Sequence, residues 1–331
     1  MKIYVAQPRN QSSETFLTQR AKREINMLGE VVYNETDRMP DAKMAGEQCP
    51  DAQILFIGWG SPRFDAEFLD AMPELKLIAY MGGGVADLVT EELENRGIIL
   101  LSGNRVFARS VAEGCLAYIL VALRRLEHYM KCARRGQWWT NDDFNNAGII
   151  GKKIGLVGFG EVTRFIAQML SVFGVEILIS SNHLTEEEAK KYGAQKATND
   201  EIFSNCDIIS IHSALNEKTK GSINRELMEK IKKGALFVNT ARGAVVDEEA
   251  MVELLKEGRF NAALDVFSTE PIPTQGHFLT PLLDMENVVL IPHMAGPTLD
   301  MREQVVLELV KDVKRFYNQE ELINKAIYRI S

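Results

Sequence analysis

The sequence has few cysteines, no long apolar run and no excess of positive charge. Its four cysteines form no CxxC pair and no cysteine–histidine cluster with zinc-ligand spacing, so we expect four separate reduced thiols and no metal site. The amino terminus lacks the apolar core of a signal peptide. The apolar stretch at residues 115–123 is shorter than the about 20 residues of a membrane-spanning helix. These absences predict a cytoplasmic protein with no membrane partner.

The charge balance argues against a general nucleic-acid binder. The chain has 38 lysines and arginines against 46 aspartates and glutamates, which gives a net charge of −8. A surface that follows a phosphate backbone needs an excess of basic residues. We therefore expect a small-molecule substrate, which a few local basic residues can still bind if it is anionic. The 331 residues suffice for about two domains.

Short apolar runs alternate with helical patterns through most of the chain. Several of these runs are apolar at successive positions, which is typical of strands buried on both faces of a parallel sheet. Helical patterns lie between them, for example at residues 110–125, 162–173 and 248–257. The alternation predicts an α/β fold with two doubly wound parallel-sheet lobes. The expected strands are residues 3–6, 31–33, 54–57, 77–80, 98–101, 154–157, 176–179, 208–211, 236–239, 263–266 and 288–291.

A break at residues 102–104 separates the two sets of strands. One long helix at 111–135 is expected to follow the break and to join the lobes. A final helical pattern at about 298–317 has no strand of its own in the second sheet, so we expect it to return to the first lobe. The predicted domains are residues 1–102 plus 299–331 and residues 103–298.

A glycine-rich loop follows the predicted strand that ends at residue 157. Glycines at the first two positions of a GxGxxG loop allow a tight turn and a close approach of backbone to a pyrophosphate. The amino end of the following helix supplies free N–H groups for the phosphates. Thr163 stands where the third glycine is usual. The predicted cofactor-binding residues here are Gly158, Phe159, Gly160, Glu161 and Val162.

The next strand end bears on the choice between NAD and NADP. An acidic residue there would accept from the ribose 2′-hydroxyl and repel a 2′-phosphate, but the chain has Ser181, Asn182 and His183 instead. These side chains can donate to a 2′-phosphate, although no arginine accompanies them. The pattern slightly favours NADP and leaves NAD open, and we include Ser181 and Asn182 among the cofactor-binding residues.

Three segments of the second half place a titratable or charged side chain just after a predicted strand. They are residues 238–247 with Arg242, 263–271 with Glu270, and 291–296 with His293. Doubly wound sheets bind their ligands at the carboxyl ends of the strands. Arginine, glutamate and histidine in three such positions together indicate a catalytic site.

These segments resemble the NxxRGxxVD, LDVFxxEP and PHxAG signatures of the D-isomer-specific 2-hydroxyacid dehydrogenase family. Further matches are residues 111–113, 136–138 and 151–153, and the resemblance extends from about residue 80 to 298. It implies a Rossmann nucleotide-binding domain inserted into a flavodoxin-like substrate (lid) domain. It also implies hydride transfer between NAD or NADP and a small 2-oxo or D-2-hydroxy acid, in a cleft between the lobes.

The resemblance implies a role for each catalytic side chain. Arg242 would hold the substrate carboxylate and polarise the carbonyl, because a guanidinium is a planar donor that stays charged. His293 would act as general acid, a task that suits histidine. Glu270 would orient the imidazole. Around the cofactor the resemblance adds His212, Thr240, Ala241, Asp265 and Gly296, together with Arg242 and His293. The segment around His212 departs from the family pattern at Ala214 and Asn216.

Residues 80–87 contain three successive glycines, which allow backbone N–H groups to converge on an anion. By resemblance this is the loop that binds the substrate carboxylate, through Gly83 and Gly84. Ala86 replaces an aspartate that is common in the family. Trp59 lines the substrate pocket or belongs to the core, and Trp138 and Trp139 lie near the site or at a subunit contact.

Two functions follow from the sequence. The favoured one is a dehydrogenase for a glyoxylate-, hydroxypyruvate-, phosphoglycerate- or lactate-like acid. The alternative is a dinucleotide-sensing protein similar to the corepressors of the same family, which keep the same catalytic residues. The chain has no low-complexity arm for protein partners, which favours the enzyme. A homodimer is expected from the family and from general frequency.

Overall fold

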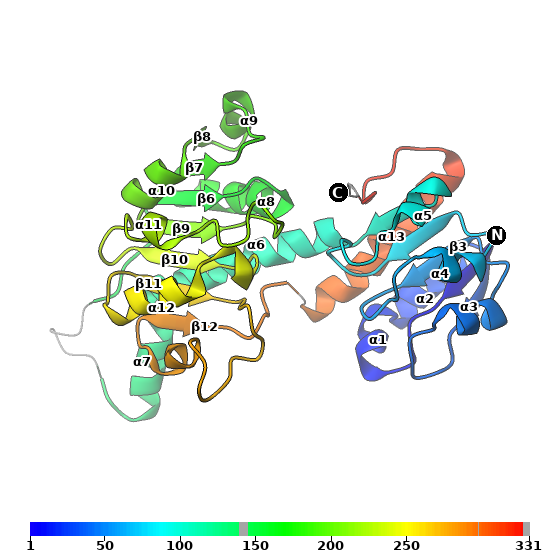
Figure 1. Ribbon diagram of the computed structural model, residues 1–331, viewed down its shortest axis with the longest axis horizontal. Coiled ribbons are helices and arrows are strands. Elements are labelled where there is room, and N and C mark those ends of the chain that lie inside the picture. The colour runs from blue at the N-terminus through cyan, green and yellow to red at the C-terminus, as the bar shows by residue number, and fades with distance from the viewer. Residues whose placement is uncertain (139–144, 297, 327–331) are drawn as a thin grey trace. The chain divides into compact units, whose positions relative to one another are not determined.

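The computed structural model describes residues 1–138, 145–296 and 298–326. The chain divides into two compact units, which we call unit 1 and unit 2 (Figure 1). Unit 1 consists of Met1–Phe107 and Pro297–Ser331, and unit 2 of Ala108–Gly296. The chain therefore leaves unit 1 once and returns to it near its end.

Unit 1 contains a five-stranded sheet in the order β2-β1-β3-β4-β5, with every neighbouring pair parallel. This is the strand order of the flavodoxin-like doubly wound fold. Strands β3 and β4 are buried at every residue, as their unbroken apolar sequence predicts. The strands are β1 (Lys2–Val5), β2 (Glu30–Tyr33), β3 (Ile54–Ile57), β4 (Leu77–Tyr80) and β5 (Ile99–Ser102).

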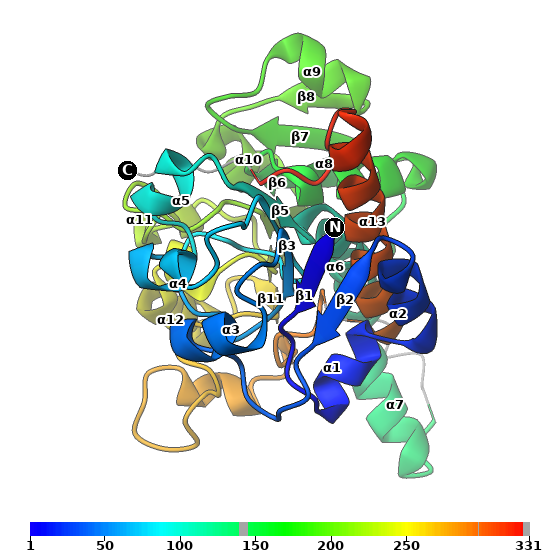
Figure 2. The same cartoon turned by 90° about the vertical axis from the view of Figure 1, so that its right-hand side faces the viewer.

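Helices cover both faces of this sheet (Figure 2). On one face α1 (Gln11–Phe16) and α2 (Gln19–Asn26) share a core with α13 (Leu299–Asn318), through Phe16, Ile25 and the valines and leucines of α13. On the other face lie α3 (Ala42–Gln48), α4 (Ala66–Asp70) and α5 (Glu91–Asn95). Helix α13 thus packs in unit 1, although all strands of the second sheet lie between β5 and α13 in the sequence.

Unit 2 contains a seven-stranded parallel sheet in the order β12-β11-β10-β9-β6-β7-β8. Apart from one added strand, this is the Rossmann order, and the direction of winding changes between β6 and β9. The sequence missed β8, which has only three residues and lies at the sheet edge. The strands are β6 (Lys153–Val157), β7 (Glu176–Ser180), β8 (Ala194–Lys196), β9 (Ile208–Ile211), β10 (Leu236–Asn239), β11 (Asn261–Leu264) and β12 (Val288–Leu290).

The single long helix expected at residues 111–135 is wrong. The structure has α6 (Asn104–Arg124) and α7 (Leu126–Arg134), separated by Arg125 in the left-handed conformation with φ of 50°. A left-handed residue breaks the helical hydrogen-bond ladder, and this position is an arginine rather than the glycine that would have indicated a break. Helix α6 also begins earlier than expected, and within it the chain passes from unit 1 to unit 2.

The remaining helices of unit 2 connect its strands (Figure 1). They are α8 (Glu161–Leu170), α9 (Glu186–Lys191), α10 (Asn199–Asn205), α11 (Arg225–Met228) and α12 (Glu248–Lys256), with short 3-10 turns at Ser171–Phe173, Gly243–Val245 and Thr280–Asp284. By length and composition alone α6 is apolar enough to cross a membrane, a test that core helices also pass. All four cysteines are free thiols, and only Cys132 is partly exposed.

Candidate active site

The predicted site residues of unit 2 lie just beyond the carboxyl ends of neighbouring strands. Asp265 follows β11, Arg242 follows β10, His212 follows β9 and Gly158 follows β6, while Ser181 follows β7. His293 follows β12 at the end of the row. Because all these strands are parallel, the residues share one edge of the sheet, on both sides of the switch in winding direction.

His293 and Glu270 form a hydrogen-bonded pair at this edge. The Nδ1 atom of His293 lies 2.7 Å from Oε2 of Glu270, and the backbone N–H of Phe267 donates to Oε1 at 2.8 Å. The carboxylate is thereby fixed, and it fixes the imidazole in turn. With Nδ1 engaged and about half of the side chain exposed, Nε2 is the ring nitrogen that can exchange a proton with a ligand.

Asp265 holds the loop that carries His293. Its carboxylate is buried and accepts hydrogen bonds from the backbone N–H groups of Met294 at 2.7 Å and Ala295 at 3.1 Å. Burial raises the pKa of this carboxyl, whereas the two amide donors oppose the rise. The hydroxyl of Tyr118 on α6 also lies within hydrogen-bonding distance, at 3.4 Å. His293 itself has φ of 57°, so the two amides after it secure a strained backbone position.

Arg242 lies on a turn that touches the loop of Glu270. The Asn239 side chain accepts from the N–H of Ala241 and donates to the carbonyl of Arg242, which fixes the turn. A Cβ on Gly243 would lie 2.2 Å from the carbonyl carbon of Phe267, so only glycine permits this approach. The guanidinium is exposed, and its Nη1 donates to the carbonyl of Ala241 at 2.6 Å.

Glu248 is a site residue that the sequence did not reveal. Both oxygens of its buried carboxylate accept from the N–H of Ser268, at 3.0 and 3.2 Å, and burial raises the pKa of this carboxyl. It thus anchors the segment that leads to Glu270. In the sequence Glu248 is an acidic residue at the start of a helix, a position where acids are common for reasons of helix stability alone.

The glycine loop after β6 has the geometry that a dinucleotide needs. Gly158 has φ of 105°, and a Cβ there would lie 2.8 Å from the backbone of His212, so the loop requires glycine. Gly160 caps α8 without a side-chain hydrogen bond, and the space in front of its Cα is open. Thr163, in the third glycine position, is buried and donates to the carbonyl of Gly158 at 2.9 Å. These features fit a pyrophosphate at the amino end of α8.

His212 is a neutral imidazole beside this loop. Its Nε2 atom is buried and has no hydrogen-bond partner among the described residues, and burial lowers the pKa of the ring to about 4. An orphaned ring nitrogen at the ligand-binding edge fits a site that a cofactor completes. Thr240 is likewise buried after β10, whereas Ala241 and Gly296 are partly exposed.

The strand end after β7 has no charged side chain. Asn182 is exposed, and the Ser181 hydroxyl accepts from the N–H of His183 at 3.3 Å. Arg164 on α8 is an arginine that contacts the glycine loop, through Phe159. The guanidinium of Arg164 lies 4.1 Å from the ring centre of Phe159 and donates to the Tyr192 hydroxyl at 3.0 Å.

In unit 1 the predicted substrate residues lie beyond β3 and β4. The Ser102 hydroxyl donates to the carbonyl of Gly83 at 2.6 Å and lies 3.2 Å from that of Gly82. A Cβ on Gly82 would lie 2.4 Å from the Tyr80 ring, so packing already explains this glycine. Gly83 has no such clash, and Gly84 is exposed. Trp59 is 41% exposed.

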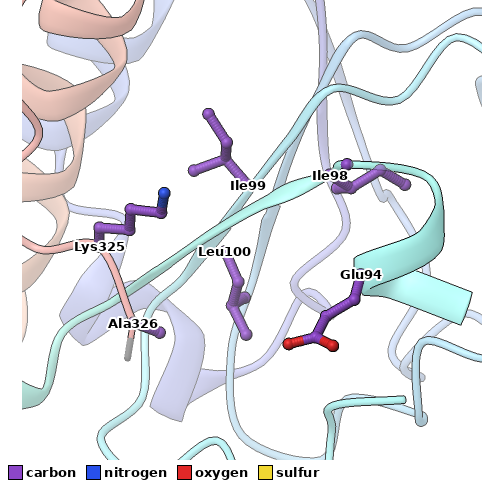
Figure 3. Close-up of a pocket in the computed structure, with 7 residues that line it drawn as sticks. Glu94, Ile98, Ile99, Leu100, Lys325 and Ala326 are labelled. Atoms are coloured by element: carbon purple, nitrogen blue, oxygen red, sulfur yellow. The ribbon is translucent and has the colours of Figure 1, made fainter. Parts of the chain in front are cut away.

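A hollow in unit 1 lies apart from the site residues described above. A hollow of about 460 Å³ lies beside Ile98, Leu100 and Lys325 and contains none of the predicted site residues (Figure 3). Trp138 is 77% exposed, and Trp139 falls outside the described residues. Within the described residues there is no group of three or more His, Cys, Asp or Glu side chains arranged to hold a metal ion.

Comparison with known proteins adds to this geometry. The NAD binding domain of D-isomer specific 2-hydroxyacid dehydrogenases matches residues 116–295. A glyoxylate reductase from Thermofilum pendens is 36% identical over 320 residues, covering 92% of each chain. This chain belongs to the D-isomer specific 2-hydroxyacid dehydrogenase family. It is therefore an NAD(P)-linked oxidoreductase of 2-oxo and 2-hydroxy acids, and the corepressor alternative finds no support.

Two further relatives show how far the similarity extends in sequence and in fold. A D-3-phosphoglycerate dehydrogenase from Mycobacterium leprae is 28% identical over 89% of this dehydrogenase, which spans only 54% of that protein. A phosphoglycerate oxidoreductase from Rhizobium etli has the same fold, with a TM-score of 0.82, full coverage of both chains and 22% identity. The predicted two-lobed parallel α/β fold is thus confirmed.

Proposed function

We propose that this dehydrogenase reduces a small 2-oxo acid with Arg242, Glu270 and His293 as its catalytic residues. The observation that carries the proposal is the His293–Glu270 hydrogen bond at 2.7 Å, on a loop anchored by Asp265 at the ligand-binding edge of a Rossmann sheet. The turn of Arg242 packs against the segment that holds Glu270, so the three groups belong to one set of contacting loops.

Each residue performs a distinct part of the reduction. When bound, a nicotinamide cofactor would supply the hydride for the carbonyl carbon. Nε2 of His293 donates the proton to the carbonyl oxygen, while Glu270 keeps Nδ1 occupied and the ring oriented. Arg242 binds the carboxylate and polarises the carbonyl with a guanidinium that stays charged. General acid catalysis of this kind is worth about 10²–10⁴-fold in rate.

For the cofactor, we assign Gly158, Phe159, Gly160, Glu161 and Val162 to the pyrophosphate end, and Ser181 and Asn182 to the adenosine ribose. His212, Thr240, Ala241, Asp265 and Gly296, with Arg242 and His293, are assigned to the nicotinamide end. The absence of an acid after β7 slightly favours NADP over NAD. Michaelis constants for NADH and NADPH test this preference, and a strong preference for NADH would refute it.

For the substrate, we assign Gly83, Gly84 and Trp59 of unit 1, together with Arg242 and His293. The carbonyls of Gly82 and Gly83 are held by Ser102, and no acceptor in the described residues engages the N–H groups of Gly83 and Gly84. Such N–H groups suit a carboxylate. A glyoxylate-, hydroxypyruvate- or phosphoglycerate-like acid agrees with the activities named for the relatives, and unit 1 would then be the substrate (lid) domain.

We further propose a cytoplasmic homodimer. Helix α7 exposes Leu126 by 44% and Met130 by 55%, and Trp138 follows it with most of its ring exposed. Apolar side chains gathered on one helix and the segment after it are typical of a subunit contact. Light scattering of the purified protein would show one dimeric species, and a monomer at micromolar concentration would contradict the proposal.

The decisive experiment measures oxidation of NADH or NADPH with a panel of 2-oxo acids. His293→Ala and Arg242→Ala should each lower kcat/KM by about 10²-fold or more, while cofactor binding survives through the contacts of the glycine loop. His128→Ala serves as a control because His128 lies on α7, outside the loops of the site. Near-normal turnover in either site variant would overturn its assigned role, and cofactor binding without any turnover would favour a sensing protein.

A further inference from the structure

A cluster of aromatic rings surrounds Trp59 in unit 1. Its indole stacks on Phe107 with ring centres 5.8 Å apart and 26° between planes, and it meets the edge of Phe16 at 5.1 Å. The guanidinium of Arg302, on the first turns of α13, lies 5.5 Å from the ring centres of both Trp59 and Phe16. Trp59 is thus held on several sides yet remains 41% exposed.

Arg302 has no acidic partner among the described residues. Its Nη1 donates to the Thr15 hydroxyl at 3.1 Å, and its Nε is buried without any acceptor. The nearest carboxylate in sequence, that of Glu303, is engaged by the Thr18 hydroxyl and lies 3.8 Å from Arg20. Within the part of the chain that the structure describes, the guanidinium of Arg302 therefore contacts aromatic faces and one hydroxyl but no carboxylate.

This arrangement is incomplete on energetic grounds. A guanidinium that loses water needs acceptors for its N–H groups, and a buried donor without one costs free energy. Contact with aromatic faces attracts a cation, but it does not replace a full set of hydrogen bonds. An anion bound to Arg302 would supply both the missing charge and the missing acceptors.

The cluster adjoins the loop that we assign to the substrate carboxylate. A Cβ on Gly83 would lie 3.9 Å from the Phe107 ring, and Phe107 stacks on Trp59. Trp59 follows β3 and Gly83 follows β4, which are neighbours in the sheet. Within unit 1, a ligand held by the glycine loop would therefore have its far end near Trp59 and Arg302.

We propose that Trp59 and Arg302 form a distal subsite for a second anionic group, a carboxylate or a phosphate, on the 2-oxo acid substrate. The proposal rests on the proposed function, because it concerns the other end of the same substrate. It assigns the enzyme to 2-oxo acids that carry two anionic groups, rather than to glyoxylate or pyruvate.

Matched substrate pairs test this assignment. 2-Oxoglutarate is compared with 2-oxopentanoate, and 3-phosphohydroxypyruvate with hydroxypyruvate, so that each pair differs only in the second anionic group. At least one dianionic member should exceed its partner in kcat/KM by about tenfold or more, the effect of one charge-assisted contact. The pair that shows the preference identifies the group as carboxylate or phosphate. Equal or better use of both monoanionic acids would overturn the proposal.

Variants separate a ligand contact from a structural role. Arg302→Gln should remove the preference by lowering kcat/KM for the dianionic acid about tenfold while changing the monoanionic value less than about twofold. Arg302→Lys should restore part of the preference, because it restores the charge. Arg20→Gln is the matched control, since Arg20 is exposed on α2 and contacts the same α13. Equal losses for both members of a pair would show that Arg302 only supports Trp59.

A binding measurement stays informative even if no 2-oxo acid is reduced. Glutarate and 3-phosphoglycerate are titrated against tryptophan fluorescence, with Trp59→Phe as the blank for the other tryptophans. The wild type should show a saturable change that Arg302→Gln loses and Arg20→Gln keeps. Saturation without turnover would refute the proposed function but support the subsite, whereas no Arg302-dependent response to either ligand would refute the subsite.

Discussion

At the scale of single residues, the site depends on buried polar groups, of which some have hydrogen-bond partners and others have none among the described residues. Asp265 holds two backbone amides and receives a long contact from Tyr118, while His212 keeps a ring nitrogen without a partner. Such groups cost folding free energy unless a ligand or a positioned loop benefits from them. Their protonation states therefore provide direct tests of the site.

Replacing Tyr118 by phenylalanine tests whether its hydroxyl tunes Asp265. A donor to a carboxylate lowers the pKa of that carboxyl, so its loss should raise further a pKa that burial already raises. Protonated Asp265 holds the Met294 and Ala295 amides less well. We expect the acidic limb of the kcat/KM profile to move to higher pH in Tyr118→Phe, with cofactor affinity unchanged. An identical profile would show that the hydroxyl is only a packing group.

His212 gives unit 2 a specific sensitivity to acid. The folded pKa is about 4, below the usual 6.5, so the unfolded chain binds more protons between these values. The contribution of neutral His212 to the free energy of unfolding is present in full above pH 6.5. It is lost as the pH falls toward 4, because the unfolded chain is protonated first. Between pH 7 and 5 the loss amounts to about 1–2 kcal/mol. In urea unfolding, His212→Gln should lose correspondingly less stability over this interval, and an equal loss in both proteins would contradict the prediction.

At the scale of elements, the site is assembled by contacts between loops rather than by the loops alone. Gly243 allows the Arg242 turn to touch Phe267, and Gly158 allows the dinucleotide loop to touch His212. Both contacts join the ends of different strands, and both would be blocked by a single added carbon. Glycine therefore sets the spacing of the catalytic groups.

Gly243→Ala should separate the Arg242 turn from the Glu270 segment. Its Cβ would lie 2.2 and 2.3 Å from backbone atoms of Phe267 and Ser268, which cannot yield without moving the loop. We expect a loss of about 1–3 kcal/mol in stability and a larger fall in kcat than in cofactor affinity. Gly148→Ala is the control, because nothing lies within 4 Å of its added carbon. Wild-type kcat in Gly243→Ala would show that the contact does not position the catalytic groups.

The sequence predicted strands more accurately than helix breaks or contacts between residues distant in the chain. The buried strands β3 and β4 are continuous apolar runs, so their places follow from pattern alone. The break at Arg125 and the edge strand β8 have no such signal. Likewise Arg242, Glu270 and His293 were located by motif, but Glu248, Tyr118 and Arg302 act through partners distant in sequence, which only the fold identifies.

At the scale of the whole molecule, each unit has its own sheet and its own core. The flavodoxin-like order in unit 1 and the Rossmann order in unit 2 both place their loops at the carboxyl ends of parallel strands. Because the cores are separate, ligands that contact one unit should stabilise that unit first. Cofactor binding in unit 2 and anion binding at Trp59 and Arg302 of unit 1 are therefore distinguishable by which unit they protect.

Saturating reduced cofactor should raise the unfolding temperature of unit 2. At 100 times its Kd, a ligand stabilises the folded state by about 2.7 kcal/mol. Gly158→Ala should abolish this shift, since an added Cβ lies 2.8 Å from the His212 backbone at a φ of 105°. Calorimetry measures the shift in unfolding temperature, and hydrogen exchange shows which unit is protected. Protection confined to unit 1, or a full shift in the variant, would contradict the assigned cofactor loop.

A segment near the end of the chain also pairs with β5, an edge strand of the sheet of unit 1. Asn324 and Ala326 exchange backbone hydrogen bonds with Ser102 and Leu100 of β5, at 2.9 and 2.8 Å, in an antiparallel bridge. The buried carboxylate of Asp312 secures this segment by accepting from the N–H groups of Ile323 and Asn324. A truncation that removes residues 321–331 would leave the N–H of Ser102 and the carbonyl of Leu100 without these partners, at a strand edge on which other polypeptides can add. Such a shortened protein should precipitate or form fibrils on storage while its nucleotide-binding half stays folded.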